Sequence, residues 1–129
     1  MANGATLWLG RVLTALFTLF MLGGSVAPKL AGAKVARDAM LQLGWDPRYI
    51  TMIGAMELTF VLIHLHPRTS ILGAVLMTAL LGGGIAAQLR AEQPLFTHVL
   101  FGVYLGIVMW GGLWLRDPTL RTFVPIRVG

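Results

Sequence analysis

The chain has 129 residues, the length of one domain, and hydrophobic residues make up 57% of it while charged residues make up 12%. Soluble domains have roughly 45–50% and 25% of these two classes. So few charges cannot cover the surface of a soluble protein, and the composition therefore predicts an integral membrane protein. The absence of cysteine excludes disulfides, thiol redox relays and cysteine-based metal centres. The net charge of +5 comes from scattered basic residues that flank apolar segments, which argues against a nucleic-acid partner.

Four apolar stretches are long enough to cross the lipid bilayer, whose core takes about 20 helical residues. Each is too long for a strand of a membrane barrel and lacks the alternation of such strands. The short turns at Pro67 and Pro94 make the last three spans antiparallel neighbours. The expected fold class is all-α, an integral membrane four-helix bundle in one domain over residues 1–129. Its spans are predicted at residues 5–24, 49–66, 69–89 and 95–115.

The first predicted span begins beside Trp8, and Trp at a span end favours the headgroup level. It contains one charged residue, Arg11. Two alternatives stay open for this guanidinium: it reaches inward towards Glu57 of the second span, or it returns to the headgroups. The SVA motif at 25–27 imitates a signal-peptide cleavage site, but Pro28 directly after it disfavours cleavage.

The connection over residues 25–48 predicts a short amphipathic helix that lies in the membrane interface. Gly44 and Pro47 are expected to end it. A plain polar loop is the alternative interpretation. The residues that would share the apolar side of this helix are Leu30, Ala33, Ala36, Met40 and Leu43.

The second predicted span carries Glu57 near its middle, which places this carboxylate close to the bilayer midplane. A charge there costs about 2.5–3.5 kcal/mol on insertion scales, so Glu57 is expected to face the bundle interior. Two interpretations stay open: a polar anchor for a ligand or proton, and a structural hydrogen bond or ion pair. His64 shares the helical face of Glu57. His66 points elsewhere, and a third ligand is missing, so no metal site is predicted.

Polar residues mark the ends of spans on the side of the amphipathic connection. Gln88 and Arg90 end the third span, His98 begins the fourth, and Lys29 follows the first. Together they could line the mouth of a cavity whose floor is Glu57. The ordinary polarity of helix ends is the alternative.

Small residues in the third and fourth spans predict close helix packing. Gly102 and Gly106 form a GxxxG motif, and Ala79 and Gly83 have the same spacing. Such residues let two backbones approach closely, either within the bundle or across a homodimer.

Three stretches resemble the DoxX-like family of small membrane proteins. They are GRVLTALFTLFMLGGSVAPKL, the LGWDP step with the Gly-x-x-Glu-Leu motif and glycine-rich third span that follow it, and WGGLWLRDPTL. The resemblance implies a four-helix membrane bundle in which Glu57 matches the second-span acid and Lys29 the basic residue after the first span. It also implies a link to membrane oxidoreductase complexes. Distant relatives include a chaperone of nicotinic receptors in the endoplasmic reticulum.

Two functions are compatible with these features. The first is an accessory component of a redox system in the bacterial inner membrane, which binds a quinone, a lipid or another lipophilic molecule through Glu57 with His98 or Arg11. The second is an assembly or chaperone module that recognises transmembrane helices through its glycine seams, as a homodimer or in a larger membrane complex. The lack of thiol chemistry favours no autonomous catalytic activity, and no covalent cofactor is expected. Basic residues are divided almost equally between the two sides, so the positive-inside rule does not fix the orientation.

Overall fold

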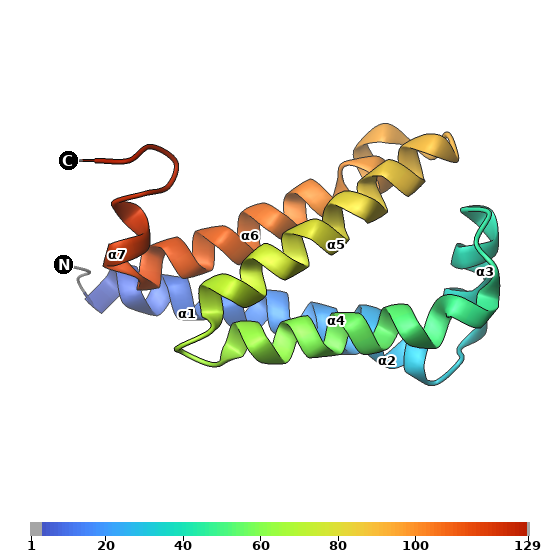
Figure 1. Ribbon diagram of the computed structural model, residues 1–129, viewed down its shortest axis with the longest axis horizontal. Helices are drawn as coiled ribbons and strands as arrows, with labels where there is room; N and C mark the ends of the chain where they lie inside the picture. Colours follow the sequence, from blue (N-terminus) through green and yellow to red (C-terminus); the bar gives the residue numbers. More distant parts are fainter. Residues whose placement is uncertain (1–3, 129) are drawn as a thin grey trace.

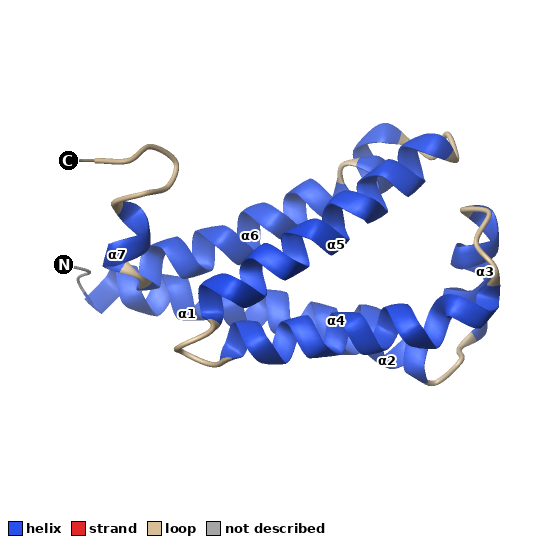
Figure 2. Ribbon diagram, in the orientation of Figure 1, coloured by secondary structure: helices blue, strands red, loops and turns tan. Residues whose placement is uncertain are grey.

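The computed structural model describes residues 4–128, and every regular element in that range is helical (Figure 2). Four helical segments are long and apolar enough to cross a membrane, so the predicted all-α fold with four spans is confirmed. Both termini and the α4–α5 turn lie at one end of the molecule, called here the terminal end, while α3 lies at the other (Figure 1). The four long helices are α1 (Gly4–Leu19), α4 (Ile50–Leu65), α5 (Ser70–Arg90) and α6 (Phe101–Arg116).

The first span is longer than predicted, because the helix continues without a break into the expected connection. α1 passes directly into a π-helical segment, η1 (Phe20–Val26), and then into one turn of α-helix, α2 (Ala27–Leu30). A π-helix has hydrogen bonds between residues five apart, and Met21 and Val26, five apart, are both buried. The helix therefore continues six residues beyond the predicted end at residue 24.

The predicted amphipathic helix between the first two spans is present as α3 (Lys34–Gln42). Its one buried residue is Met40, and most of its other side chains are exposed. Gly32 and Gly44 flank the helix with positive φ angles of 68° and 78°, which glycine adopts without the steric cost of a Cβ. The expected stop at Gly44 is confirmed.

α4 and α5 form an antiparallel hairpin through the short turn at Pro67, as predicted. The two backbones come closest at Gly73, where an added Cβ would overlap the backbone of His64. His64 is 1% exposed, and its Nδ1 lies 2.9 Å from the carbonyl oxygen of Ser70 at the start of α5. The close approach of α5 to the end of α4 therefore requires a glycine.

α1 packs against α6 through small residues. A Cβ added to Gly10 would lie 2.8 Å from the carbonyl oxygen of Gly112, and one added to Gly112 would lie 3.0 Å from the backbone nitrogen of Thr14. Larger side chains from all four helices meet beside this contact and form the core, which includes Phe17, Met21, Val61, Met77, Met109 and Leu113.

α5 and α6 diverge from α1 and α4 towards the end of the molecule that carries α3 (Figure 1). A π-helical turn, η3 (Leu95–Val99), begins the fourth span there and packs against α5 and α6. In the same half of α5, Gly82, Gly83 and Gly84 each have open space where a Cβ would stand. The helices are thus packed closely at the terminal end and spread apart at the other.

Candidate functional site

Glu57 lies in a buried polar cluster with Ser25 and Lys29. Glu57 is 8% exposed, so the prediction that it faces the protein interior is confirmed. The Lys29 Nζ lies 3.0 Å from Oε1 and 3.2 Å from Oε2 of Glu57, and it donates to the Ser25 Oγ at 2.6 Å. The Ser25 hydroxyl in turn donates to Glu57 Oε2 at 2.8 Å.

The partner of Glu57 is Lys29, and Arg11, the partner considered first, does not reach it. Arg11 and Ser25 belong to one continuous helix, and the rise of an α-helix separates them by about 20 Å along its axis. Lys29 reaches the carboxylate because α2 prolongs that helix and packs against α4. The idea that Arg11 pairs with Glu57 is therefore wrong.

The polar side-chain groups of the cluster form hydrogen bonds with one another. Both carboxylate oxygens of Glu57 accept hydrogen bonds, and the ammonium group of Lys29 also donates to the carbonyl oxygen of Ser25 at 3.5 Å. The two opposite charges compensate each other, which makes their burial in an apolar bundle tolerable. This geometry favours the structural interpretation, in which the pair fastens the end of the first span to the middle of α4.

The other residues predicted at the mouth of a cavity are not joined to this cluster. His98 is exposed on η3, where its ring nitrogen contacts the neighbouring threonine. Arg90 is exposed at the end of α5, and the buried Oε1 of Gln88 has no hydrogen-bond partner among residues 4–128. η3 packs on α5 and α6, whereas Glu57 and Lys29 belong to α4 and α2. Of the predicted group, Lys29 is the member that contacts Glu57.

His64 lies on the same face of α4 as Glu57, as predicted, and it is part of the core. Its ring meets the Phe17 ring edge-on, with the centroids 6.0 Å apart and an interplanar angle of 82°. Its Nε2 has no hydrogen-bond partner among the described residues. In the same part of the chain, no three His, Asp or Glu side chains are grouped so that they could hold a metal ion. His64 therefore packs the α4–α5 turn against α1.

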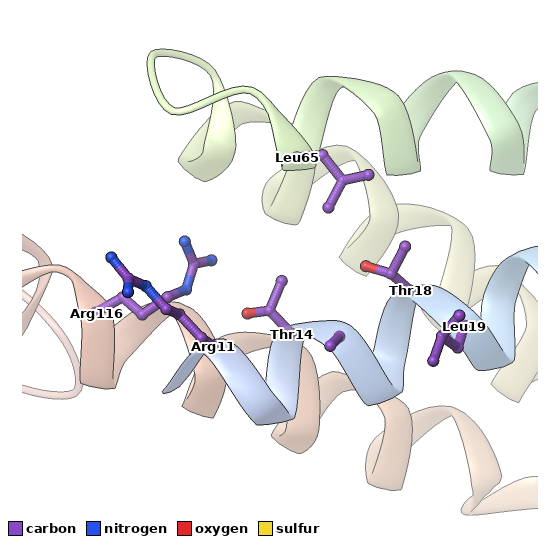
Figure 3. A pocket seen from close by; sticks show the side chains of 7 residues that line it. Arg11, Thr14, Thr18, Leu19, Leu65 and Arg116 are labelled. Carbon is purple, nitrogen blue, oxygen red and sulfur yellow. The ribbon is translucent and has the colours of Figure 1, made fainter. Parts of the chain in front are cut away.

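An open groove runs along α1 beside the ends of α4 and α6 (Figure 3). Its volume is about 380 Å³. The guanidinium groups of Arg11 and Arg116 lie side by side at one end of it, and Leu19 lies towards the other. The lining residues are Arg11, Thr14, Ala15, Thr18 and Leu19 of α1, Leu65 of α4 and Arg116 of α6.

Several polar groups of this groove lack a partner within the protein. The hydroxyl oxygens of Thr14 and Thr18 are buried without a hydrogen bond among residues 4–128. Arg11 is exposed, and Arg116 is half-buried with its Nε donating to the Gly112 carbonyl at 3.3 Å. No ion pair within the described part of the chain involves either arginine. The groove thus combines free donors and positive charge with an apolar wall.

The sequence indicates Arg11 as a site residue but does not connect it with Arg116. Arg11, Thr14 and Thr18 recur at spacings of three and four residues, which places them on one face of a helix. This signal is weak, because a threonine in an apolar helix is common. Arg116 looks like an ordinary residue at a span end until the packing of α6 against α1 is known.

The predicted packing residues have different environments. Gly102 lies in a close contact, because an added Cβ would be 2.7 Å from the Ile85 side chain of α5. Gly106 and Gly83 have open space at that position, and Ala79 is exposed. Of these four small residues, Gly102 therefore makes a close contact within the bundle. A contact of Gly106, Gly83 and Ala79 with another chain stays a prediction.

Comparison with known proteins agrees with this architecture. The sequence pattern of the DoxX-like family matches residues 12–112, a stretch that includes the Ser25–Lys29–Glu57 cluster and five of the seven groove residues. Arg11 and Arg116 lie just outside it. No curated protein and no solved structure matches the chain. The family match covers most of the sequence, and four helices can span a membrane. The protein is therefore a multi-pass membrane protein that belongs to the DoxX-like family.

Proposed function

We propose that the protein is an accessory membrane protein that binds a lipophilic molecule in the groove of Arg11 and Arg116. One observation carries this proposal: free hydrogen-bond donors and an apolar wall occur together in one open groove. Binding sites for small molecules typically combine a mostly apolar lining with a few polar groups that orient the ligand. A molecule with an apolar tail and a head that accepts hydrogen bonds matches this lining.

The groove supports binding better than the Ser25–Lys29–Glu57 cluster does. In the cluster, the donors and acceptors already satisfy one another. A ligand would have to break the ion pair, which would leave one buried charge without its partner. In the groove, the exposed Arg11 can donate to a ligand without giving up an ion pair among residues 4–128.

A quinone and a lipid are the two ligands that we propose first. A quinone has carbonyl oxygens that accept hydrogen bonds and an apolar tail, and DoxX-like proteins are linked to membrane oxidoreductase complexes. On that link we propose an accessory role in a redox system of the bacterial inner membrane. The chain's own contribution would be to bind and position the lipophilic molecule.

A variant that fills the groove tests the proposal. Ala15 lines the groove and is exposed, so Ala15→Trp would occupy the space of the ligand. Ala79 is an exposed alanine of α5 outside the groove, so Ala79→Trp is the matched control. Thermal unfolding in detergent is measured with and without a short-chain quinone or a diacyl lipid. A ligand that binds the folded state raises the Tm.

The wild type and Ala79→Trp are expected to gain stability with the ligand, and Ala15→Trp is not. An equal gain in Ala15→Trp would contradict binding in the groove. If the lipid raises the Tm and the quinone does not, the quinone is removed as the ligand, and the redox role loses its support.

A second function, recognition of a partner transmembrane helix, is favoured by the small residues that the bundle leaves open. Gly106 on α6 and Gly83 on α5 have no atom near the position of a Cβ. Glycines in such positions let another helix approach closely. A second copy of the chain or a client membrane protein would use them, as an assembly module does.

Gly106→Leu tests this second function without disturbing the bundle, because the new side chain enters open space. Val103→Leu, at an exposed position of the same helix, is the control. If a partner helix docks at Gly106, Gly106→Leu loses the cross-linked complexes that the wild type and Val103→Leu form in native membranes. Unchanged complexes in Gly106→Leu would exclude docking at this glycine.

A further inference from the structure

The groove places two positive charges next to each other, and neither arginine forms an ion pair among residues 4–128. Arg11 and Arg116 come from different helices, and their guanidinium groups lie side by side (Figure 3). The nearest acid in the sequence, Asp117, accepts hydrogen bonds from the backbone N–H groups of Thr119 and Leu120 and caps α7 (Pro118–Arg121). Two like charges at one site destabilise each other. A bound anion between them would remove this repulsion.

The rest of the groove has an apolar lining that can contact a hydrocarbon chain. Beyond the arginines, Ala15 and Leu19 of α1 and Leu65 of α4 form an apolar wall. Arg11 and Leu19 are separated by about 12 Å along the helix, given the rise of 1.5 Å per residue. Thr14 is 9% exposed, and its hydroxyl has no hydrogen-bond partner among residues 4–128. A charged head next to an apolar path describes an amphiphile rather than a free ion.

An exposed aromatic residue near Arg11 indicates the depth of the site in the membrane. Trp8 is 67% exposed and lies one turn before Arg11 on α1. An exposed tryptophan favours the headgroup level of a bilayer. The two guanidinium groups are thus at the level where lipid phosphates lie, with the apolar wall directed towards the membrane centre.

We propose that this groove binds the phosphate of an anionic phospholipid, with one acyl chain along Ala15, Leu19 and Leu65. This inference rests on the proposed function and specifies its ligand. The planar, forked guanidinium group matches phosphate oxygens and remains charged at every physiological pH. The terminal end favours anions as a whole, because five arginines face one acid there: Arg11, Arg68, Arg116, Arg121 and Arg127 against Asp117. An anionic head is therefore preferred over a zwitterionic or neutral one.

Charge-removing variants test the inference. Arg11→Gln and Arg116→Gln each remove a charge from the groove, and glutamine retains the Cγ with which Arg116 packs on Gly10. Arg127→Gln is the matched control, since it removes one exposed arginine at the same end outside the groove. Native mass spectrometry measures the affinity of each protein for phosphatidylglycerol, for phosphatidylcholine with the same chains, for a quinone and for inorganic phosphate.

The wild type and Arg127→Gln are expected to bind phosphatidylglycerol more tightly than the other three probes. Each groove variant should lose about fivefold or more of that affinity, the usual effect of one basic residue near a membrane surface. The Tm of each variant without lipid shows whether it is folded, and Arg11, being exposed, is the substitution least able to disturb the fold.

The alternative results are distinguishable. Equal affinity for all the lipophilic probes, still lost in Ala15→Trp, would overturn the anionic preference and leave the proposed function intact. Inorganic phosphate that binds as tightly as phosphatidylglycerol would overturn the assignment to a lipid. Equal binding of every probe by the wild type, Arg11→Gln, Arg116→Gln and Ala15→Trp would overturn both proposals.

Discussion

A carboxylate in the middle of a transmembrane helix has to be compensated, and the Ser25–Lys29–Glu57 cluster does this across two spans. The side chains of Lys29 and Glu57 are 20% and 10% exposed, so water screens their interaction little. The cluster joins α4 to the end of the first span. These two helices are linked in sequence by a long connection that contains α3 rather than by a short turn. At the residue scale, it therefore acts as a fastening between helices.

Removing one member of the pair should destabilise the protein more than removing both. Lys29→Met leaves a buried carboxylate, and Glu57→Gln leaves a buried ammonium, so each single variant should lose about 3 kcal/mol of unfolding free energy. The double variant should recover most of this loss. Unfolding by denaturing detergent in mild micelles measures the free energies.

The exposed pair of Arg48 and Asp46 provides the control, since their side chains are 70% and 53% exposed. Arg48→Met should therefore have a small effect, as exposed ion pairs do. If Lys29→Met and Glu57→Gln are as harmless as Arg48→Met, the cluster does not hold the helices together.

The sequence predicts that Glu57 faces inward, because an ionised group in a span avoids lipid. It does not predict the partner. Lys29 looks like a residue of the connection until the helix is known to continue through η1 and α2. Arg11 is the cation that the sequence places inside the first span, but it lies about 20 Å along that helix from Ser25, which contacts Glu57. A contact between two helices depends on where each helix ends, and hydropathy locates helix ends poorly.

At the scale of elements, the π-helical segment η1 changes which residues of the first span face the protein interior. Pro28 has no N–H group to donate, so the regular hydrogen-bond pattern before it is interrupted. η1 lies directly before this proline, and the extra residue per turn places both Met21 and Val26 inside. The hydrophobic pattern of α1 alone does not predict this change of register.

Two glycine-to-alanine substitutions in α5 should have opposite effects. An added Cβ at Gly73 overlaps the backbone of His64, so Gly73→Ala should destabilise the α4–α5 hairpin by about 1–3 kcal/mol, the usual cost of overpacking. At Gly83 the Cβ enters open space, so Gly83→Ala should stabilise the helix by up to about 1 kcal/mol. The same unfolding measurement in micelles compares the two. A loss of stability in Gly83→Ala would show that another chain packs against this glycine.

At the scale of the whole molecule, the two ends of the bundle differ in helix packing and in charge. The terminal end is closely packed and has five arginines against one acid, whereas the α3 end is spread apart and has basic and acidic residues in nearly equal number. The four spans can be predicted from sequence because a bilayer requires long apolar helices. The groove cannot, because Arg11 and Arg116 meet only through the packing of α1 on α6.

The central claim is that the groove of Arg11 and Arg116 holds a lipophilic molecule. Mass spectrometry of the organic extract from protein purified in mild detergent tests it most directly, with the extracts of the wild type, Ala15→Trp and Ala79→Trp compared per mole of chain. The account predicts an amphiphile that is retained stoichiometrically by the wild type and Ala79→Trp and is depleted in Ala15→Trp. Extracts that do not differ among the three proteins would contradict it.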